Sequence, residues 1–390
     1  MRTTACLLTA LLLHAAAPFA AACTVPVFRY ALERWEPDDY DLLIFTKAQL
    51  DPGLQSLLQS LNPINPADGP QANLAIWTIN PEQPDQTQYI PRHMLDAVNG
   101  QTLPYALLIC PRRQTIVWKG PPTQRALNAI PSSPARRELA RRLLQGDSAV
   151  LILLHGSNPQ RNQQAALLAR TVLDQAAKDI SLNPLATQPA PDDTYFRRDV
   201  SGLPPLQLRF SSMEVPNQPD EALLQRMIRA DLPPNTSDEP LLLWAYGRGR
   251  VLDPLTIDDP DKARQTLLHD AWFLCGDCQC QVKQLNPGID LVYNIDWDAI
   301  IVGAYTLEQV LPGMHTSLDA RQTPPGASQP TGLPQASPPT LPQPAHTPPD
   351  PLQQNAASIS PVVTNLIFAF AAFALVVAIL TLWFRKRTPD

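Results

Sequence analysis

The sequence predicts an α/β ectodomain of two similar halves, held outside a membrane by a Pro-rich stalk and one C-terminal transmembrane helix. Each half shows a strand-helix-strand pattern followed by a hairpin and a helix. Hydrophobic residues make up 44% of the 390 residues, enough for sizeable cores. The composition departs from that of ordinary soluble domains, with 44 Pro, 15 Gly and only 17% charged residues. This composition indicates a non-globular stretch beside the folded part.

The first half covers residues 23–146 and alternates apolar segments of strand period and helix period. The predicted elements are a helix at Val27–Trp35, a strand at Tyr40–Phe45, a helix at Lys47–Leu61, a strand at Asn73–Ile79, a short helix around Met94, strands at Tyr105–Cys110 and Thr115–Trp118, and a helix at Pro134–Leu144. The last two strands flank the turn Pro111–Arg113 and therefore form a hairpin.

The second half, residues 147–311, repeats this order. The predicted elements are a strand at Ala149–Leu154, a helix at Pro159–Ala177, a strand at Leu206–Val215, a helix at Asp220–Arg229, strands at Leu241–Tyr246 and Val251–Leu252, and a helix at Pro260–Leu274. A strand-helix-strand unit crosses over right-handed with parallel strands, and a hairpin adds antiparallel ones. Each half therefore forms a mixed sheet with helices on its faces.

A proline stands directly before the strand that opens each hairpin, Pro104 in the first half and Pro240 in the second. This order of elements resembles the thioredoxin-like fold, in which a proline introduces the corresponding strand. The resemblance implies two tandem thioredoxin-like domains with Pro104 and Pro240 as candidate cis-prolines. A generic α/β arrangement is the alternative.

The two halves depart from that family where its chemistry resides. Thioredoxin-like oxidoreductases carry Cys-x-x-Cys where the first strand meets its helix, because the helix N-terminus lowers the pKa of the attacking thiol. The corresponding stretches here are Phe45-Thr46-Lys47-Ala48 and His155-Gly156-Ser157-Asn158, without a cysteine. The resemblance then implies non-catalytic binding domains, with no catalytic residue, cofactor or metal assigned.

The cysteines form the only chemical cluster in the sequence. Cys275, Cys278 and Cys280 lie within six residues and form a candidate disulfide or redox cluster, because oxidising compartments favour local disulfides. Zinc binding through these thiolates with His269 is a further alternative, although a second Cys-x-x-Cys is absent from the sequence. Cys110 ends an apolar strand and is expected to be a buried small hydrophobe.

The N-terminus has the pattern of a secretory signal, residues 1–22. Arg2 precedes an apolar stretch and the small residues Ala20, Ala21 and Ala22, so cleavage would leave Cys23 first and open to lipidation. The segment that follows, Cys-Thr-Val-Pro-Val-Phe-Arg-Tyr-Ala-Leu-Glu-Arg-Trp, resembles the opening of a group of uncharacterised bacterial envelope proteins. On its own chemistry it is a docking helix, with Phe28, Leu32 and Trp35 on one stripe.

The C-terminal region predicts the membrane attachment. Residues 312–361 are rich in Pro, Ser, Thr, Gln and Ala and predict an extended stalk. Residues 362–384 are uncharged and long enough to cross a bilayer as a helix. Arg385, Lys386 and Arg387 in the tail, residues 385–390, place the C-terminus in the cytoplasm. We expect a single-pass cell-membrane protein with its ectodomain in the periplasm or another extracytoplasmic space.

The net charge of −6 disfavours nucleic acid as a partner. The clustered arginines Arg136, Arg137, Arg141 and Arg142 alternate with leucines at helical spacing and predict a solvated helix face. Together these observations favour a non-enzymatic interaction or accessory protein whose partner is another envelope protein or a membrane complex. The alternative is a membrane-anchored thiol-disulfide oxidoreductase or metal-binding protein that uses the cysteine cluster.

Overall fold

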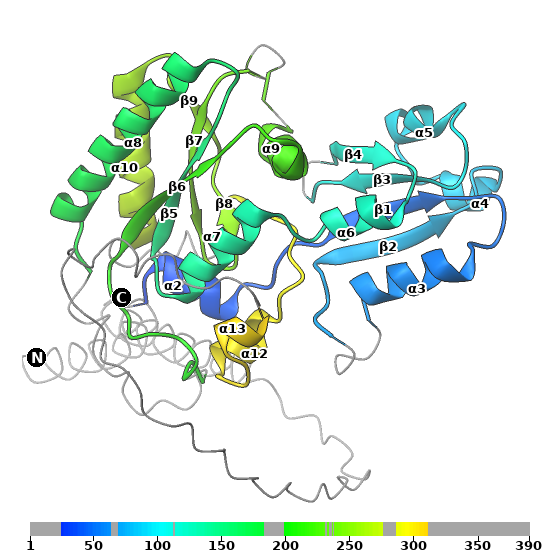
Figure 1. Ribbon diagram of the computed structural model, residues 1–390, viewed down its shortest axis with the longest axis horizontal. Helices are drawn as coiled ribbons and strands as arrows, with labels where there is room; N and C mark the ends of the chain where they lie inside the picture. The colour runs from blue at the N-terminus through cyan, green and yellow to red at the C-terminus, as the bar shows by residue number, and fades with distance from the viewer. Residues whose placement is uncertain are drawn as a thin grey trace, which may run out of the picture. The chain divides into compact units, whose positions relative to one another are not determined.

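Two mixed β-sheets organise the part of the chain that the computed structural model describes (Figure 1). This part is residues 25–310 without 64–68, 112–113, 183–198, 231, 234–235, 237 and 276–285. The first sheet has the strand order β2-β1-β3-β4, and the second has the order β10-β8-β7-β5-β6 with β9 paired to β7. The prediction of an α/β protein with a mixed sheet in each half is confirmed.

The first half begins with a helix and contains the four-stranded sheet. Its elements are α2 (Val27–Arg34), β1 (Tyr40–Phe45), α3 (Pro52–Leu61), β2 (Leu74–Ile79), α4 (Pro84–Thr87), α5 (Arg92–Val98), β3 (Tyr105–Ile109), β4 (Ile116–Gly120), α6 (Gln124–Ala129) and α7 (Pro134–Leu144). The predicted helix at residues 47–61 starts five residues too early, because Asp51 caps α3 and Pro52 occupies its first position.

The second half repeats the order and adds short elements at its end. Its elements are β5 (Ala149–Leu154), α8 (Pro159–Asp179), β6 (Phe210–Val215), the 3₁₀ helix η3 (Pro219–Glu221), α9 (Ala222–Arg229), β7 (Leu241–Tyr246), β8 (Arg250–Val251), β9 (Leu255–Thr256), α10 (Pro260–Cys275), β10 (Ile289–Asp290), α12 (Trp297–Ile301) and α13 (Leu307–Val310). The strand predicted at residues 206–215 is shorter and starts at Phe210.

Strand pairing is equivalent in the two sheets. β1 pairs in parallel with β2, and β5 pairs in parallel with β6 in the same relative register. The third and fourth strands of each half then add in antiparallel fashion, β3 and β4 in one sheet and β7 and β8 in the other. The order β6-β5-β7-β8 therefore repeats the order β2-β1-β3-β4.

Helices cover both faces of the second sheet. Every residue of β5 and of β7 is buried, which explains why both strands are continuous apolar runs. Helices α8 and α10 lie side by side on one face, where Ala169 and Leu267 join the core beneath them (Figure 1). The opposite face belongs to a larger core that includes Leu139 of α7 and Met227 of α9.

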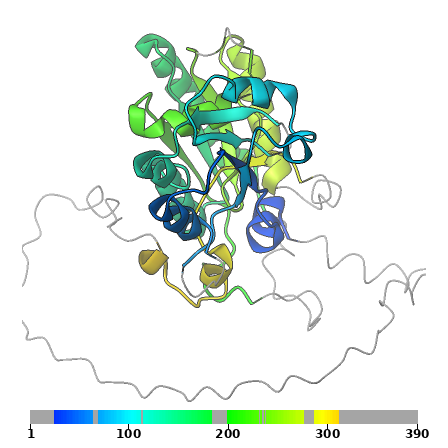
Figure 2. The ribbon, with the colours of Figure 1, turned by 90° about the vertical axis from the view of Figure 1, so that its right-hand side faces the viewer.

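The first sheet also has helices on both faces (Figures 1 and 2). Leu42 and Ile44 of β1 point into the core shared with Leu58 of α3, whereas Leu43 and Phe45 alternate to the other face. On that other face Met94 and Val98 of α5 complete a smaller core.

Both halves share one core and belong to a single compact unit that holds all the described residues. The segment around β10 provides several of the hydrogen bonds between the two halves. The Tyr40 hydroxyl donates to the Asp290 carbonyl over 2.9 Å, and the backbone N–H of Tyr293 donates to Asn73 Oδ1 over 2.8 Å. Arg136 Nη1 donates to the Val292 carbonyl over 2.8 Å.

Helix α2 docks through its apolar side, as its sequence predicted. Val27, Phe28 and Leu32 are buried, and the Leu32 carbonyl accepts a hydrogen bond from Arg248 Nε over 2.9 Å. The Trp35 ring lies 5.5 Å from the Arg250 guanidinium, in cation–π geometry. The helix that follows the predicted signal is therefore an integral part of the folded unit.

The arginine-rich face predicted on α7 is wrong for two of its four members. Arg136 is 1% exposed and Arg141 is 6% exposed, whereas Arg137 is exposed. The Arg136 guanidinium is buried because the carbonyls of Ala129, Ile130 and Val292 all accept hydrogen bonds from it. Two of these acceptors precede the helix by a few residues and the third is 156 residues away, and none of them leaves a trace in the helical periodicity.

Several predicted segments lie outside the described residues: the signal at 1–22, Cys23, the stalk at 312–361, the span at 362–384 and the tail at 385–390. Within the described part, none of the helices has the length and apolar character that crossing a bilayer requires.

Candidate functional site

The first strand-helix junction, Phe45 to Ala48, corresponds to the position at which thioredoxin-like oxidoreductases carry Cys-x-x-Cys. Thr46 Oγ1 donates to the Ala48 carbonyl over 2.8 Å, and Lys47 Nζ pairs with Glu82 Oε1 at 2.6 Å on the surface. The N-terminus of α3 lies further along the chain, where Asp51 Oδ1 already accepts from the Leu54 N–H over 2.9 Å. The helix end that would activate a thiol is therefore displaced from this junction and capped by a carboxylate.

A cavity of about 520 Å³ adjoins this junction, and Phe45, Lys47, Glu82 and Leu103 are among the residues that line it. Leu103 precedes Pro104, and the peptide bond between them is cis. The cavity combines an apolar wall with the charged Lys47–Glu82 pair at its rim.

The second junction, His155 to Asn158, is closed by the segment that leads into β7. The Ser157 N–H donates to the Asp238 carbonyl over 2.9 Å, and a Cβ at Gly156 would lie 2.1 Å from that same oxygen. Pro240, predicted as a second cis-proline, does not follow a cis bond in the described chain. The approach to it is fixed by Arg229 Nη2, which donates to the Glu239 carbonyl over 2.8 Å.

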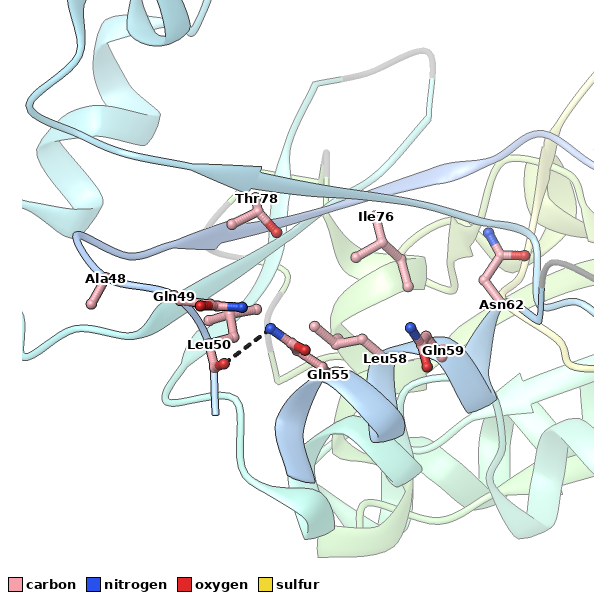
Figure 3. Close-up of a pocket in the computed structure, with 9 residues that line it drawn as sticks. All are labelled: Ala48, Gln49, Leu50, Gln55, Leu58, Gln59, Asn62, Ile76 and Thr78. Carbon is pink, nitrogen blue, oxygen red and sulfur yellow. Dashed lines mark hydrogen bonds between the residues drawn. The ribbon is translucent and has the colours of Figure 1, made fainter. Parts of the chain in front are cut away.

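A groove of about 460 Å³ runs between α3 and the outer strand β2 (Figure 3), and we call it the β2 groove. Its lining residues are Ala48, Gln49, Leu50, Gln55, Leu58, Gln59, Asn62, Ile76 and Thr78. Figure 3 shows Ile76 and Leu58 facing each other across it, with amide side chains along the helix side. Among the described residues no charged side chain lines the β2 groove, so the chemistry of this lining is that of neutral hydrogen-bonding groups on an apolar floor.

The backbone of β2 exposes hydrogen-bonding groups to this groove. β2 is the outermost strand of its sheet. The Asn73 carbonyl accepts from the Tyr40 N–H of β1, and the Ile79 carbonyl accepts from the N–H of Thr46, the residue after β1. Because residues alternate along a parallel ladder, the N–H and C=O groups of Ile76 and Thr78 point away from β1. Within the described part of the chain no other strand pairs with these groups, and they form a sheet edge beside the amide side chains.

Other parts of the chain already form hydrogen bonds with the beginning of this edge. Ala72, just before β2, forms an antiparallel bridge with Asn294, and Asn62 Nδ2 donates to the Leu74 carbonyl over 2.9 Å. The edge is thus occupied at its beginning by another segment of chain and by an amide side chain. It becomes open at Ile76 and Thr78.

Cys275, the described member of the predicted cysteine cluster, is unsuited to thiolate chemistry. It is the last residue of α10, it is 1% exposed, and burial raises the pKa of its thiol far above the usual range. Cys278 and Cys280 lie outside the described residues. Cys110 is fully buried, as predicted, and its Sγ lies 3.9 Å from the Tyr40 hydroxyl.

The zinc alternative loses one of its proposed ligands. The side chain of His269 is 70% exposed and its ring stacks on Phe273, whereas Cys275 points into the core. In the part of the chain described here, no cluster of three or more His, Cys, Asp or Glu side chains is arranged to hold a metal ion.

Sequence reasoning missed the β2 groove. Gln55, Gln59 and Asn62 follow one another at spacings of four and three residues, which places three amides on one face of α3. That spacing was the available signal, but an amide stripe on a helix is ordinarily a solvated face. No protein-family model and no curated protein matches this chain.

Proposed function

We propose that this protein is a membrane-tethered accessory protein whose ectodomain binds an extended segment of another envelope protein. In this proposal a signal at residues 1–22 directs export, and a stalk at 312–361 and a span at 362–384 hold the ectodomain in the periplasm or another extracytoplasmic space. The ectodomain consists of two thioredoxin-like domains, residues 23–146 and 147–311, without a redox pair at the family's usual position. The shared strand order of the two sheets supports the fold assignment.

The observation that carries the binding function is the open edge of β2 above the β2 groove. An extended peptide that adds to a sheet edge gains main-chain hydrogen bonds, while alternate side chains reach pockets beside the strand. Ile76 and Thr78 offer the main-chain groups, and Leu58 with Gln59 line the space for the side chains. The antiparallel bridge between Ala72 and Asn294 continues along the same edge, which favours an antiparallel occupant.

The lining of the β2 groove indicates which segments fit. Because the described lining holds no charged side chain, a charged side chain entering the groove would lose hydration without gaining an ion pair from that lining. We therefore expect an uncharged segment with amide, hydroxyl or small apolar side chains. The open edge is short, and each net hydrogen bond contributes about 1 kcal/mol, so the complex should be transient rather than permanent.

The test introduces a photoreactive amino acid at Gln59 in the full-length protein in native membranes. A second change, Thr78→Pro, removes the outward N–H without touching the pairing with β1, as edge-strand proline does. We expect a crosslink from position 59 to an envelope polypeptide that Thr78→Pro abolishes and the control Thr78→Val retains. An identical crosslink in the Pro and Val variants would contradict edge pairing.

The proposed topology has its own test. Lys47 and Lys262 are exposed in the folded unit and should react with an impermeant amine reagent once the outer layers of the cell are opened. Lys386 in the proposed cytoplasmic tail should react only after the membrane is permeabilised. Labelling of Lys386 alone would reverse the orientation.

A further inference from the structure

A cavity of about 410 Å³ lies where β4, α6, α7, η3 and α9 meet, at a different place from the β2 groove. Three arginines from three different helices line it: Arg125 of α6, Arg137 of α7 and Arg226 of α9. Asp220 is the one carboxylate in the lining, and Trp118 of β4 forms part of the apolar wall. We call this the arginine cavity. Its volume lies within the range of ordinary small-molecule sites.

The three guanidinium groups lack carboxylate partners among the described residues. Arg137 donates to the neutral Ser132 hydroxyl over 3.0 Å, and no ion pair is formed by Arg125 or Arg226 with any described residue. Other arginines of the helix that carries Arg137 do have a carboxylate partner. Arg141 and Arg142 on α7, for example, both bind Glu138 at 2.6 Å.

The buried carboxylate of Glu221 does not pair with the cavity arginines, because it binds the start of α7. Glu221 is 3% exposed, its Oε2 accepts from the Ser133 hydroxyl over 2.6 Å, and its Oε1 accepts from the Ala135 N–H over 2.7 Å. It therefore caps the first turn of α7. The guanidinium of Arg136, which lies behind that turn, donates to backbone carbonyls and the Ser133 hydroxyl, and the negative charge of Glu221 acts on it. Glu221 is therefore not a counter-charge for the three cavity arginines.

The side chains of the three cavity arginines are all exposed, so an anion can reach them from solvent. Desolvation by the surrounding protein lowers the pKa of Arg226, with no carboxylate opposing the effect, whereas at Arg229, one turn along α9, Asp238 and Glu239 oppose it. A negative ligand at the cavity would supply the missing counter-charge, and an Arg fork binds carboxylate or phosphate oxygens through paired hydrogen bonds.

We propose that the arginine cavity binds a small ligand with an oxyanion held by Arg125, Arg137 and Arg226 and with a ring or other flat apolar part against Trp118. The site is independent of the proposed peptide binding at β2. The oxyanion is a carboxylate or a phosphate, two groups that present the same oxygen geometry to arginine.

The test uses the full-length protein in a non-ionic detergent and isothermal titration calorimetry. Four probes separate the parts of the ligand: inorganic phosphate, phenyl phosphate, benzoate and benzyl alcohol. We expect phenyl phosphate or benzoate to bind more tightly than inorganic phosphate, benzyl alcohol to give no signal, and added NaCl to weaken binding. The stronger of phenyl phosphate and benzoate identifies the oxyanion.

Variants assign the binding to this cavity. Arg226→Gln and Arg125→Gln should each weaken the ring-bearing anion by about tenfold, the usual loss for a charged hydrogen bond. Arg170→Gln, an exposed arginine on α8, is the matched control and should leave the affinity unchanged. Trp118→Leu should weaken the ring-bearing anions but not inorganic phosphate. Absence of binding by every probe at millimolar concentration, or equal affinities in the Arg226 and Arg170 variants, would overturn the proposal.

Discussion

The carboxyl group of Asp290 is buried between the N-terminal segment and β8, and two opposing effects set its charge. Its side chain pairs with Arg250 and accepts the Asp38 N–H over 2.9 Å. Burial and the Asp38 carboxylate nonetheless outweigh Arg250 and raise the pKa of Asp290 to about 6. One guanidinium thus serves two carboxylates, since Arg250 Nη2 also lies 3.0 Å from Asp38 Oδ2.

The raised pKa predicts the sign of a pH effect on stability. The folded protein holds the Asp290 proton up to about pH 6, while the unfolded chain releases it near pH 4. The Asp290 contribution to the free energy of unfolding should therefore fall as pH rises between these values, by up to about 3 kcal/mol. Urea unfolding from pH 4 to pH 7 should show this slope in the natural protein and lack it in Asp290→Asn. Parallel profiles for the two proteins would contradict the prediction.

The reactivity of Cys275 separates the binding proposal from the redox alternative. A fully buried thiol with a raised pKa is a poor nucleophile, so N-ethylmaleimide at pH 8 should leave Cys275 unmodified in the folded protein. Peptide mapping by mass spectrometry should find it modified once urea is added, which serves as the control. Rapid modification of Cys275 in the folded state would favour a redox role.

At the scale of elements, α7 shows how a helix is placed by contacts far away in the chain. Its bounds, Pro134–Leu144, agree with the sequence expectation, and Ser133 caps a first turn that starts with Pro134. The sequence did not predict which face of α7 is buried, because the Arg136 guanidinium turns inward to donate to the carbonyls of Ile130 and Val292. A helical-period argument counts arginine as solvent-facing and cannot anticipate acceptors supplied by another segment.

Two substitutions on α7 compare the stability contributed by the buried Arg136 with that contributed by the exposed Arg137. Arg136→Leu would leave three backbone carbonyls in the core without their donor, which should lower the free energy of unfolding by roughly 3 kcal/mol or more. Arg137→Leu, at the exposed neighbouring position, should change it by less than about 0.5 kcal/mol. Urea denaturation followed by circular dichroism gives both values. Equal effects would show that the buried hydrogen bonds contribute little.

The elements that sequence reasoning recovered and those it missed differ in where their stability comes from. Strands β5 and β7 are apolar runs, β1 is apolar except for Asp41, and the predicted bounds of all three agree with the structure. Strands β9 and β10 have two residues each and exist only through pairing with β7 and β8. At the start of α12, Asp296 caps the helix and Asp298 binds Arg248.

On the scale of the molecule, the two candidate sites differ in how far apart their residues lie in the sequence. The β2 groove is lined entirely by residues between Ala48 and Thr78, whereas the arginine cavity gathers side chains from both halves. The sequence did identify the two strand-helix junctions that lack cysteines. It did not reveal that the second is closed by the Asp238 carbonyl, because that contact joins residues more than 80 positions apart.

The shared core predicts that the two halves unfold together. Asn73 binds across the interface through both ends of its amide: Nδ2 donates to the Leu291 carbonyl over 3.2 Å and Oδ1 accepts from the Tyr293 N–H. A chain of residues 24–311 should therefore give one calorimetric transition, with equal calorimetric and van't Hoff enthalpies. Asn73→Ala should lower its midpoint without splitting it, because a lost buried pair costs about 1–3 kcal/mol.

Gln160→Ala, on the exposed start of α8, is the control for that measurement and should leave the midpoint in place. If instead the chain melted in two steps, and Asn73→Ala moved only one of them, the halves would be independent domains. The ties through Tyr40, Asn73 and Arg136 would then be contacts between folded bodies rather than part of one core. Because Tyr40 and the Arg136 guanidinium are buried among residues of both sheets, separating the halves would expose apolar surface, and a single transition is the expected result.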